Sequence, residues 1–304
     1  MMQLLRPHII IIVFLFSIFI PITVCLAEDG NHYRSTKGGD IVVALDGSGD
    51  FSTIQGALNS AQKGDIIIIN TGTYYEQIHV NKQVEIIGME KDNTIIHGEN
   101  RTNVITIFHD FCKISDLTIQ YCGGNKTNPF IAGINIQANG VIIEDCIFRS
   151  NQNGVIIDDQ HGCSILRSHF FNNIGGIDID NSEGCTVEHN VIVGGKSGVT
   201  VYESSEITIQ WNNISKTTVF GIYIQNSHDC IVIGNTLFDN NGSHGGDIHL
   251  LFNENTEVSG NSGDVYIADD TVGASICCNI LVVVIPITIL LLLLVINSVL
   301  HRKE

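Results

Sequence analysis

The most constraining feature of this chain is a repeat of about 22 residues in its second half. One recurring segment has the pattern of "CTVEHNVIV" and a second has the pattern of "GIDID", and both alternate apolar and polar residues as half-buried β-strands do. The first set begins at Cys163, Cys185, Ile207 and Cys230, and the second set begins at Gly154, Gly176, Gly198 and Gly221. Both sets are spaced by 22, 22 and 23 residues, so the two strands recur in step.

Short strands repeated at this period predict a coil of stacked parallel strands. One turn cannot bury its apolar face alone and needs turns above and below it. Stacking places equivalent residues in columns about 4.8 Å apart. One column is predicted to contain Ser168, Asn190, Asn212, Asn235 and Asn261. Because an Asn amide can bond both its neighbour and the backbone at a bend, we interpret this ladder as structural.

The start of the coil is predicted to carry a short covering helix. Ser52 and Gln55 have the spacing of a capping box, and apolar residues from Ile54 to Ala61 fall on one helical face. The segments 65–70 and 83–88 are then expected as the first strands. Cys163, Cys185 and Cys230 share an inward column and are interpreted as buried thiols, because stacked side chains point in parallel and are poorly placed for a disulfide.

Both ends of the chain have the composition of targeting segments. Arg6 precedes an apolar run of about a dozen residues, which predicts a signal peptide. The apolar run 279–300 has the length of a membrane-spanning helix and is followed by a basic tail. The expected organisation is a signal peptide (1–27), a linker (28–39), the β-helix (40–268), a stalk (269–278), a transmembrane helix (279–300) and a cytoplasmic tail (301–304). The β-helix is therefore expected outside the cell, anchored at the cell surface.

The charge of the chain excludes some partners. It has 32 acidic residues against 15 Lys and Arg, which gives a net charge of −17. A polyanionic nucleic acid or an anionic lipid surface would be repelled, so we expect neither as a ligand. The remaining expected partners are a polysaccharide or cell-surface glycan, and the membrane through the C-terminal helix.

The strand "GIDID" and its equivalents place polar residues on one outward face. The expected members of this face are Asp158, Asp178, Asp180, Tyr202, Tyr223 and His249. Crowded carboxylates raise one another's pKa, and pairs about 5–9 Å apart serve glycosidases, so the three Asp residues are the candidate catalytic groups. Tyrosines beside acids also suit sugar rings, so all six residues are candidates for binding a glycan. Calcium binding and ordinary solvated surface remain open alternatives, and a second acidic face with Glu144 and Glu188 is interpreted as surface.

The segment "VALDGSGDFSTIQGALNSAQKGD", beginning at Val43, resembles the opening of pectin methylesterases. The later rungs, of the type "Gly-Ile-x-Ile … Cys-x-Ile-x-x-Asn", resemble the NosD-like family, which is associated with carbohydrate binding and sugar hydrolysis. The resemblance covers residues 40–268 and implies a single right-handed parallel β-helix of the pectin-lyase type, with eight to ten turns. It implies less about activity, since many chemistries share this scaffold.

The esterase resemblance fails at the catalytic positions. Following its register, the two catalytic Gln residues fall on Ala132 and Gln152, the acid–base Asp on Asn153 and the nucleophilic Asp on Gly176. A carboxylate nucleophile and a proton donor are both required by that reaction, so pectinesterase activity is not expected. The NosD name implies copper delivery, but the Met residues are not clustered and the inward cysteines are expected to be buried, so we predict no metal site.

Two functional classes remain. One is a surface module that binds, and in the enzymatic alternative cuts, polysaccharide through the Asp/Tyr face. The other is a structural or adhesive envelope protein without a small-molecule site, and a divergent pectinesterase or glycoside hydrolase is a further alternative. We favour the binding module and expect no cofactor, with calcium as the one candidate ion.

Overall fold

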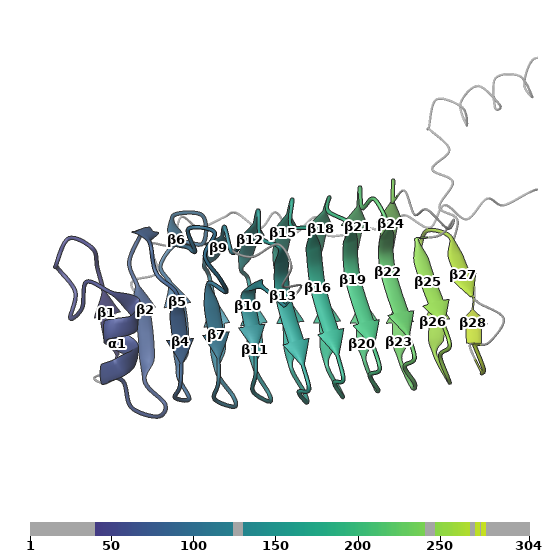
Figure 1. Cartoon of the computed structure of the whole chain (residues 1–304), viewed down its shortest axis with the longest axis horizontal. Helices are drawn as coiled ribbons and strands as arrows, with labels where there is room; N and C mark the ends of the chain where they lie inside the picture. The colour runs from purple at the N-terminus through teal and green to yellow at the C-terminus, as the bar shows by residue number, and fades with distance from the viewer. Residues whose placement is uncertain (1–39, 124–129, 241–246, 268–270, 274, 278–304) are drawn as a thin grey trace, which may run out of the picture. The chain divides into compact units, whose positions relative to one another are not determined.

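The chain forms a parallel β-helix, as the repeat predicts. The computed structural model describes residues 40–123, 130–240, 247–267, 271–273 and 275–277. These residues form one short helix and 28 short strands, arranged in three parallel sheets. Figure 1 shows the turns following one another from β1 to β28, with each full turn supplying one strand to each sheet.

The three sheets, which we call A, B and C, have eleven, eight and nine strands. Sheet A contains β1 (Ile41–Val43), β2 (Ile66–Ile69), β5 (Glu85–Gly88), β8 (Lys113–Ser115), β11 (Ile142–Glu144), β14 (Ser164–Leu166), β17 (Thr186–Glu188), β20 (Thr208–Gln210), β23 (Ile231–Ile233), β26 (Glu257–Ser259) and β28 (Ser275–Cys277). Sheet B contains β3 (Gly72–Tyr74), β6 (Thr94–His97), β9 (Thr118–Gln120), β12 (Ile147–Arg149), β15 (His169–Phe171), β18 (Val191–Val193), β21 (Asn213–Ser215) and β24 (Thr236–Phe238). Sheet C contains β4 (Ile78–Val80), β7 (Ile105–Ile107), β10 (Ala132–Ile136), β13 (Asn153–Asp158), β16 (Gly175–Asp180), β19 (Ser197–Tyr202), β22 (Phe220–Gln225), β25 (Ile248–Leu251) and β27 (Val265–Ile267).

The core is built from inward columns that run through successive turns. In sheet C, Ile177 lies between Val155 and Val199, and all three side chains are buried. In sheet B, Phe148 and Phe170 stack with ring centroids 4.6 Å apart. Each inward side chain therefore contacts its own equivalents above and below, which is how a turn with only a few apolar residues obtains a continuous core.

The bends between the sheets are held by ladders of side-chain hydrogen bonds. The predicted Asn ladder is confirmed: the Asn212 side chain accepts hydrogen bonds from the backbone and the amide of Asn190, at 2.9 and 3.0 Å, and donates one to Asn235. A second ladder, which the sequence analysis did not identify, runs through Ser182, Ser204 and Ser227 at another bend. These ladders satisfy backbone N–H groups that the bends leave outside the sheets.

Many bend residues adopt a left-handed backbone without being glycine. One such column contains Arg167, His189 and Trp211, with φ between 46° and 56°, and continues into Gly234. This conformation costs roughly 1–2 kcal/mol for a residue with a Cβ atom. Each of the three non-glycine residues donates its N–H to a carbonyl of the next turn at 3.0–3.2 Å, so stacking compensates for the local strain.

The helix α1 (Ile54–Ser60) lies at the N-terminal end of the coil beside β1, as Figure 1 shows. Ile54, Ala57 and Leu58 are buried, which confirms the predicted apolar face. The predicted cap is wrong by one residue, because Thr53 rather than Ser52 is the N-cap and accepts a hydrogen bond from the Gly56 N–H.

The predicted signal peptide, linker, transmembrane helix and tail lie outside the described residues. The predicted end of the β-helix at residue 268 is wrong, because β28 lies within the predicted stalk (269–278) and pairs in register with β26, so the coil extends further than the repeat pattern indicated. Within the described part of the chain, no helix has the length and apolar character to cross a bilayer.

Candidate functional site

The outward positions of sheet C bring the predicted site residues together. Asp158 pairs in register with Asp180, and Asp180 pairs with Tyr202. In the neighbouring column, Asp178 pairs with Thr200, Thr200 with Tyr223, and Tyr223 with His249. All six predicted residues therefore lie on one face, which we call the sheet C face. Their adjacency is confirmed, and their roles stay predictions.

The acidic end of this face is crowded. Asp178 accepts a hydrogen bond of 2.6 Å from the Thr200 hydroxyl. Burial, together with the nearby Asp158 carboxylate, raises the pKa of Asp178 despite that hydrogen bond. Burial also raises the pKa of Asp180, with further contributions from Asp158, Asp178 and Glu203. Burial and the neighbouring Asp158 carboxylate therefore both disfavour the charged forms of Asp178 and Asp180.

The tyrosines lie directly beside these acids. Burial, the neighbouring Tyr223 and the two carboxylates of Asp178 and Asp180 raise the pKa of Tyr202 to about 12. Tyr223 donates a hydrogen bond of 2.7 Å to the side-chain oxygen of Gln225. Both phenols therefore stay protonated at neutral pH and present an O–H beside an aromatic face.

A row of aromatic rings continues from the acids toward the C-terminal turns. The Tyr202 and Tyr223 ring centroids are 5.5 Å apart, those of Tyr223 and His249 5.9 Å, and those of His249 and Tyr266 4.2 Å. Phe220 stacks on Tyr223 at 4.5 Å. These rings border an open hollow of about 340 Å³, lined by Phe220, Tyr223, His249, Leu251 and Tyr266.

Sequence reasoning missed three residues of this hollow: Phe220, Leu251 and Tyr266. The regular spacing breaks here, because His249 follows Tyr223 by 26 residues and Tyr266 follows His249 by only 17. A strict 22-residue count therefore does not reach Leu251 and Tyr266. Phe220 was missed for another reason: it pairs in register with Ser197, one residue before the Gly221 from which the repeat was counted. The usable signal was the "Ile-x-Leu" and "Val-Tyr-Ile" alternation of β25 and β27, which marks the outward positions without a fixed period.

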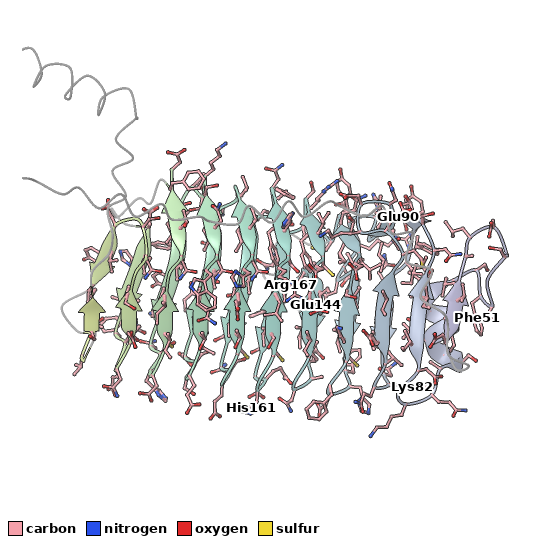
Figure 2. The ribbon with its side chains drawn as sticks, turned by 180° about the vertical axis from the view of Figure 1, so that it is seen from behind. Phe51, Lys82, Glu90, Glu144, His161 and Arg167 are labelled. Atoms are coloured by element: carbon pink, nitrogen blue, oxygen red, sulfur yellow. The ribbon has the colours of Figure 1, made fainter. Side chains whose placement is uncertain are left out.

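The second acidic face, on sheet A, has a different electrostatic character. Glu144 lies between Lys113 and Arg167, with N–O distances of 2.8 and 2.6 Å, and Figure 2 labels Glu144 beside Arg167. Partial burial favours the neutral acid, but the hydrogen bonds from these two cations outweigh it and lower the pKa of Glu144. Glu188 accepts a hydrogen bond from Gln210. The acids of sheet A thus have partners on their own surface.

The esterase positions do not form a catalytic site. Ala132 and Asn153 are neighbours in register, and the next position is Gly175, so the column holds no carboxylate at these turns. A Cβ atom added to Gly176 would lie 2.3 Å from the Gly198 carbonyl oxygen. No side chain fits there without moving the backbone of the next turn. His161 pairs with Glu183 at 3.2 Å, an ion pair that forms when the imidazole is protonated.

The six cysteines whose side chains the structure describes are free and buried, as predicted for Cys163, Cys185 and Cys230. Burial raises the pKa of the Cys146 thiol to about 12 and that of Cys230 to about 11. Copper binds thiolates, whereas burial keeps the thiols of Cys146 and Cys230 protonated inside the core. The described residues also contain no cluster of three or more His, Cys, Asp or Glu side chains with metal-site geometry, and Met89 is exposed. The copper role implied by the resemblance does not fit these residues.

Solved structures share the fold. An alginate lyase from Paenibacillus sp. str. FPU-7 superposes with a TM-score of 0.61 at 15% identity, covering 78% of this chain and 95% of the lyase. The surface adhesin PfbA of Streptococcus pneumoniae superposes with a TM-score of 0.55 at 15% identity, covering 73% and 72% of the two chains. At such identities the likeness concerns the β-helix alone.

Part of the chain is also similar in sequence to pectinesterases. A probable pectinesterase/pectinesterase inhibitor of Arabidopsis thaliana is 35% identical over 82 residues, which cover 24% of this chain and 14% of the relative. The chain thus spans only a small part of the pectinesterases it matches. A family model described as periplasmic copper-binding protein (NosD) matches residues 58–263, about two thirds of the chain. This β-helix protein therefore belongs to the NosD family.

Proposed function

We propose that this protein is an extracytoplasmic module that binds polysaccharide through the sheet C face. The apolar run 279–300 would hold it at the membrane, with the β-helix outside. The observation that carries the proposal is the continuous row from the aspartates through Tyr202 and Tyr223 to His249 and Tyr266, beside the hollow.

The geometry of this row suits a sugar chain. Successive rings are separated by roughly one strand spacing and stack on one another, with His249 and Tyr266 only 14° from parallel, so they offer a row of ring edges along the coil. Sugar rings have C–H faces that pack on aromatics and hydroxyls that bond to polar groups at the edge. Tyr223 and His249 are only 8% and 7% exposed, whereas Tyr266 is 42% exposed, so the hollow has fixed walls and an accessible rim.

A glycan array with the full-length chain, purified in detergent, tests the proposal. We expect binding to a subset of polysaccharides and a loss of about tenfold or more in affinity for Tyr223→Ala with Tyr266→Ala. The matched control is Trp211→Ala, which removes an exposed aromatic outside sheet C. Absence of binding to every glycan would favour the structural or adhesive role instead.

The same material tests for catalysis. The paired carboxylates Asp158 and Asp180 are the observation that keeps a hydrolase as the second candidate. Incubation with each bound glycan, followed by mass spectrometry of the products, would show shortened chains if the face is catalytic. Unchanged glycans leave a binding module.

A further inference from the structure

The charges of sheet C and sheet A are organised differently. None of the nine strands of sheet C, as the structure describes them, contains a Lys or Arg residue. Sheet A contains Lys113, which contacts Glu85 at 3.2 Å and Glu144 at 2.8 Å, and Arg167 follows β14. Glu85 and Glu144 on sheet A are therefore neutralised by the protein, while Asp158, Asp178 and Asp180 are not neutralised by a cation of their own sheet.

A metal ion is a poor match for these aspartates. Calcium requires six to eight oxygen ligands converging on one point. The three carboxylates instead occupy neighbouring positions on a flat strand surface, and the described residues supply no group of three spaced for an ion. An extended organic cation can contact such a surface without convergence.

The apolar end of the face adds a second requirement for the ligand. Asp180 is the register neighbour of Tyr202, and the hollow begins at Tyr223 on the following strand. A ligand long enough to contact both ends needs ring faces for the aromatics and positive charge for the carboxylates.

We propose that the ligand of the sheet C face is an amine-bearing glycan, a polymer of wholly or partly de-N-acetylated amino sugars. Its sugar rings would pack on Tyr223, His249 and Tyr266, and its protonated amines would lie by Asp178 and Asp180. This inference rests on the proposed function. Charge complementarity is the argument, because polyuronates such as pectin and alginate would meet uncompensated carboxylates and be repelled.

Binding of short oligomers to the full-length chain tests this class. The probes are glucosamine hexamer, N-acetylglucosamine hexamer, galacturonate hexamer and lysine hexamer, measured by calorimetry at low and at moderate salt. We expect the glucosamine oligomer to bind about tenfold more tightly than the acetylated one, with the advantage shrinking as salt screens the charges.

Two double variants distinguish the effect of the sheet C carboxylates from the effect of the protein's overall negative charge. Asp178→Asn with Asp180→Asn should abolish the preference for the amine while leaving binding of the acetylated oligomer in place. Glu188→Gln with Glu257→Gln removes the same charge from sheet A and should keep the preference. Thermal unfolding of each variant checks that the coil is intact, and Asp178→Asn alone serves if the double variant fails to fold.

The outcomes distinguish this inference from the proposed function. Equal affinity for the amine and acetylated oligomers, or tighter binding of galacturonate, overturns the amine class and leaves a glycan-binding face. Binding of lysine hexamer with the same Asp dependence, and of no glycan, overturns both in favour of a basic peptide ligand. Failure of all four probes overturns the amine class, while the glycan array decides separately whether the face binds another glycan.

Discussion

Asp178 and Glu144 are two half-buried carboxylates whose surroundings predict opposite effects on stability. Burial raises the pKa of Asp178, so its ionised form destabilises the folded state at any pH above that raised pKa. We expect Asp178→Asn to increase the free energy of unfolding at neutral pH by up to about 1 kcal/mol. The Asn oxygen can still accept the Thr200 hydrogen bond.

The pH dependence gives the sign of each effect. The cost of ionised Asp178 is relieved as pH falls from its folded pKa toward its unfolded pKa, so the gain from Asp178→Asn should vanish in acid. Glu144 has a lowered pKa and stabilises the fold above its unfolded pKa, so Glu144→Gln should cost about 0.5–1 kcal/mol at neutral pH and nothing in strong acid. Urea unfolding across this pH range measures both, and equal signs for the two variants would contradict the assignment.

At the residue level, the sequence predicted which residues share a column. It did not predict which side chains form hydrogen bonds or ion pairs with one another. The period places Asp158 beside Asp180 and aligns Asn190 with Asn212, because each residue's neighbour is fixed by counting one turn. The Ser182 ladder was missed because serine is common at turns and has no ladder signature of its own. The neutralisation of Glu144 by Lys113 and Arg167 depends on side-chain reach across turns of unequal length.

The helix α1 is held at both ends by side chains of the first turn. Glu76 accepts hydrogen bonds from the backbone N–H groups of Ile54 and Gln55 at 2.8 and 2.9 Å. Lys82 donates to the carbonyls of Asn59 and Ala61 at 2.8 and 2.6 Å. Each charge has the sign that the helix dipole favours at its end. We expect Glu76→Ala or Lys82→Ala to weaken the helix by about 1 kcal/mol.

Amide hydrogen exchange measures this loss where it occurs. The amides of Ala57 and Leu58 should exchange several-fold faster in either variant, while those of β15 and β18 stay protected, since the ends of a stacked fold can open without the middle. Lys63→Ala is the control, because Lys63 is a nearby exposed lysine. Equal acceleration throughout the coil would show that the helix and the turns unfold together.

At the element level, the same clamp explains the error in the predicted cap. The sequence shows local capping-box spacing at Ser52 and Gln55, yet the Gln55 side chain donates to Asn59 and its oxygen accepts from the His79 N–H. Glu76 supplies the acidic partner from more than 20 residues away. Strand positions were predictable because they are repeated, whereas the end of the coil is unique and depends on long-range contacts.

At the scale of the molecule, the coil should tolerate loss of one complete turn. Deletion of residues 186–207 joins Cys185 to Thr208, which occupies the position that Thr186 had after Cys185. Every column then keeps its register across the deletion: Ser168 becomes the neighbour of Asn212, and Asp180 becomes the neighbour of Gln225. Since stability is roughly a sum over turns, we expect a folded β-helix with a denaturant m-value lower by roughly a tenth.

Deletion of half a turn should have the opposite result. Removing residues 186–196 joins Cys185 to Ser197, so a strand of sheet C enters the position of sheet A, and the Asn and Ser ladders lose register at every following turn. Each misplaced bend leaves buried N–H groups without acceptors, at about 1–3 kcal/mol apiece, which exceeds the stability of most domains when summed over several turns. Circular dichroism and cooperative thermal unfolding distinguish the two deletions. If the 11-residue deletion folds as well as the 22-residue one, vertical register is not what holds the coil together, and the shared face of Asp178, Tyr202 and His249 loses its physical basis.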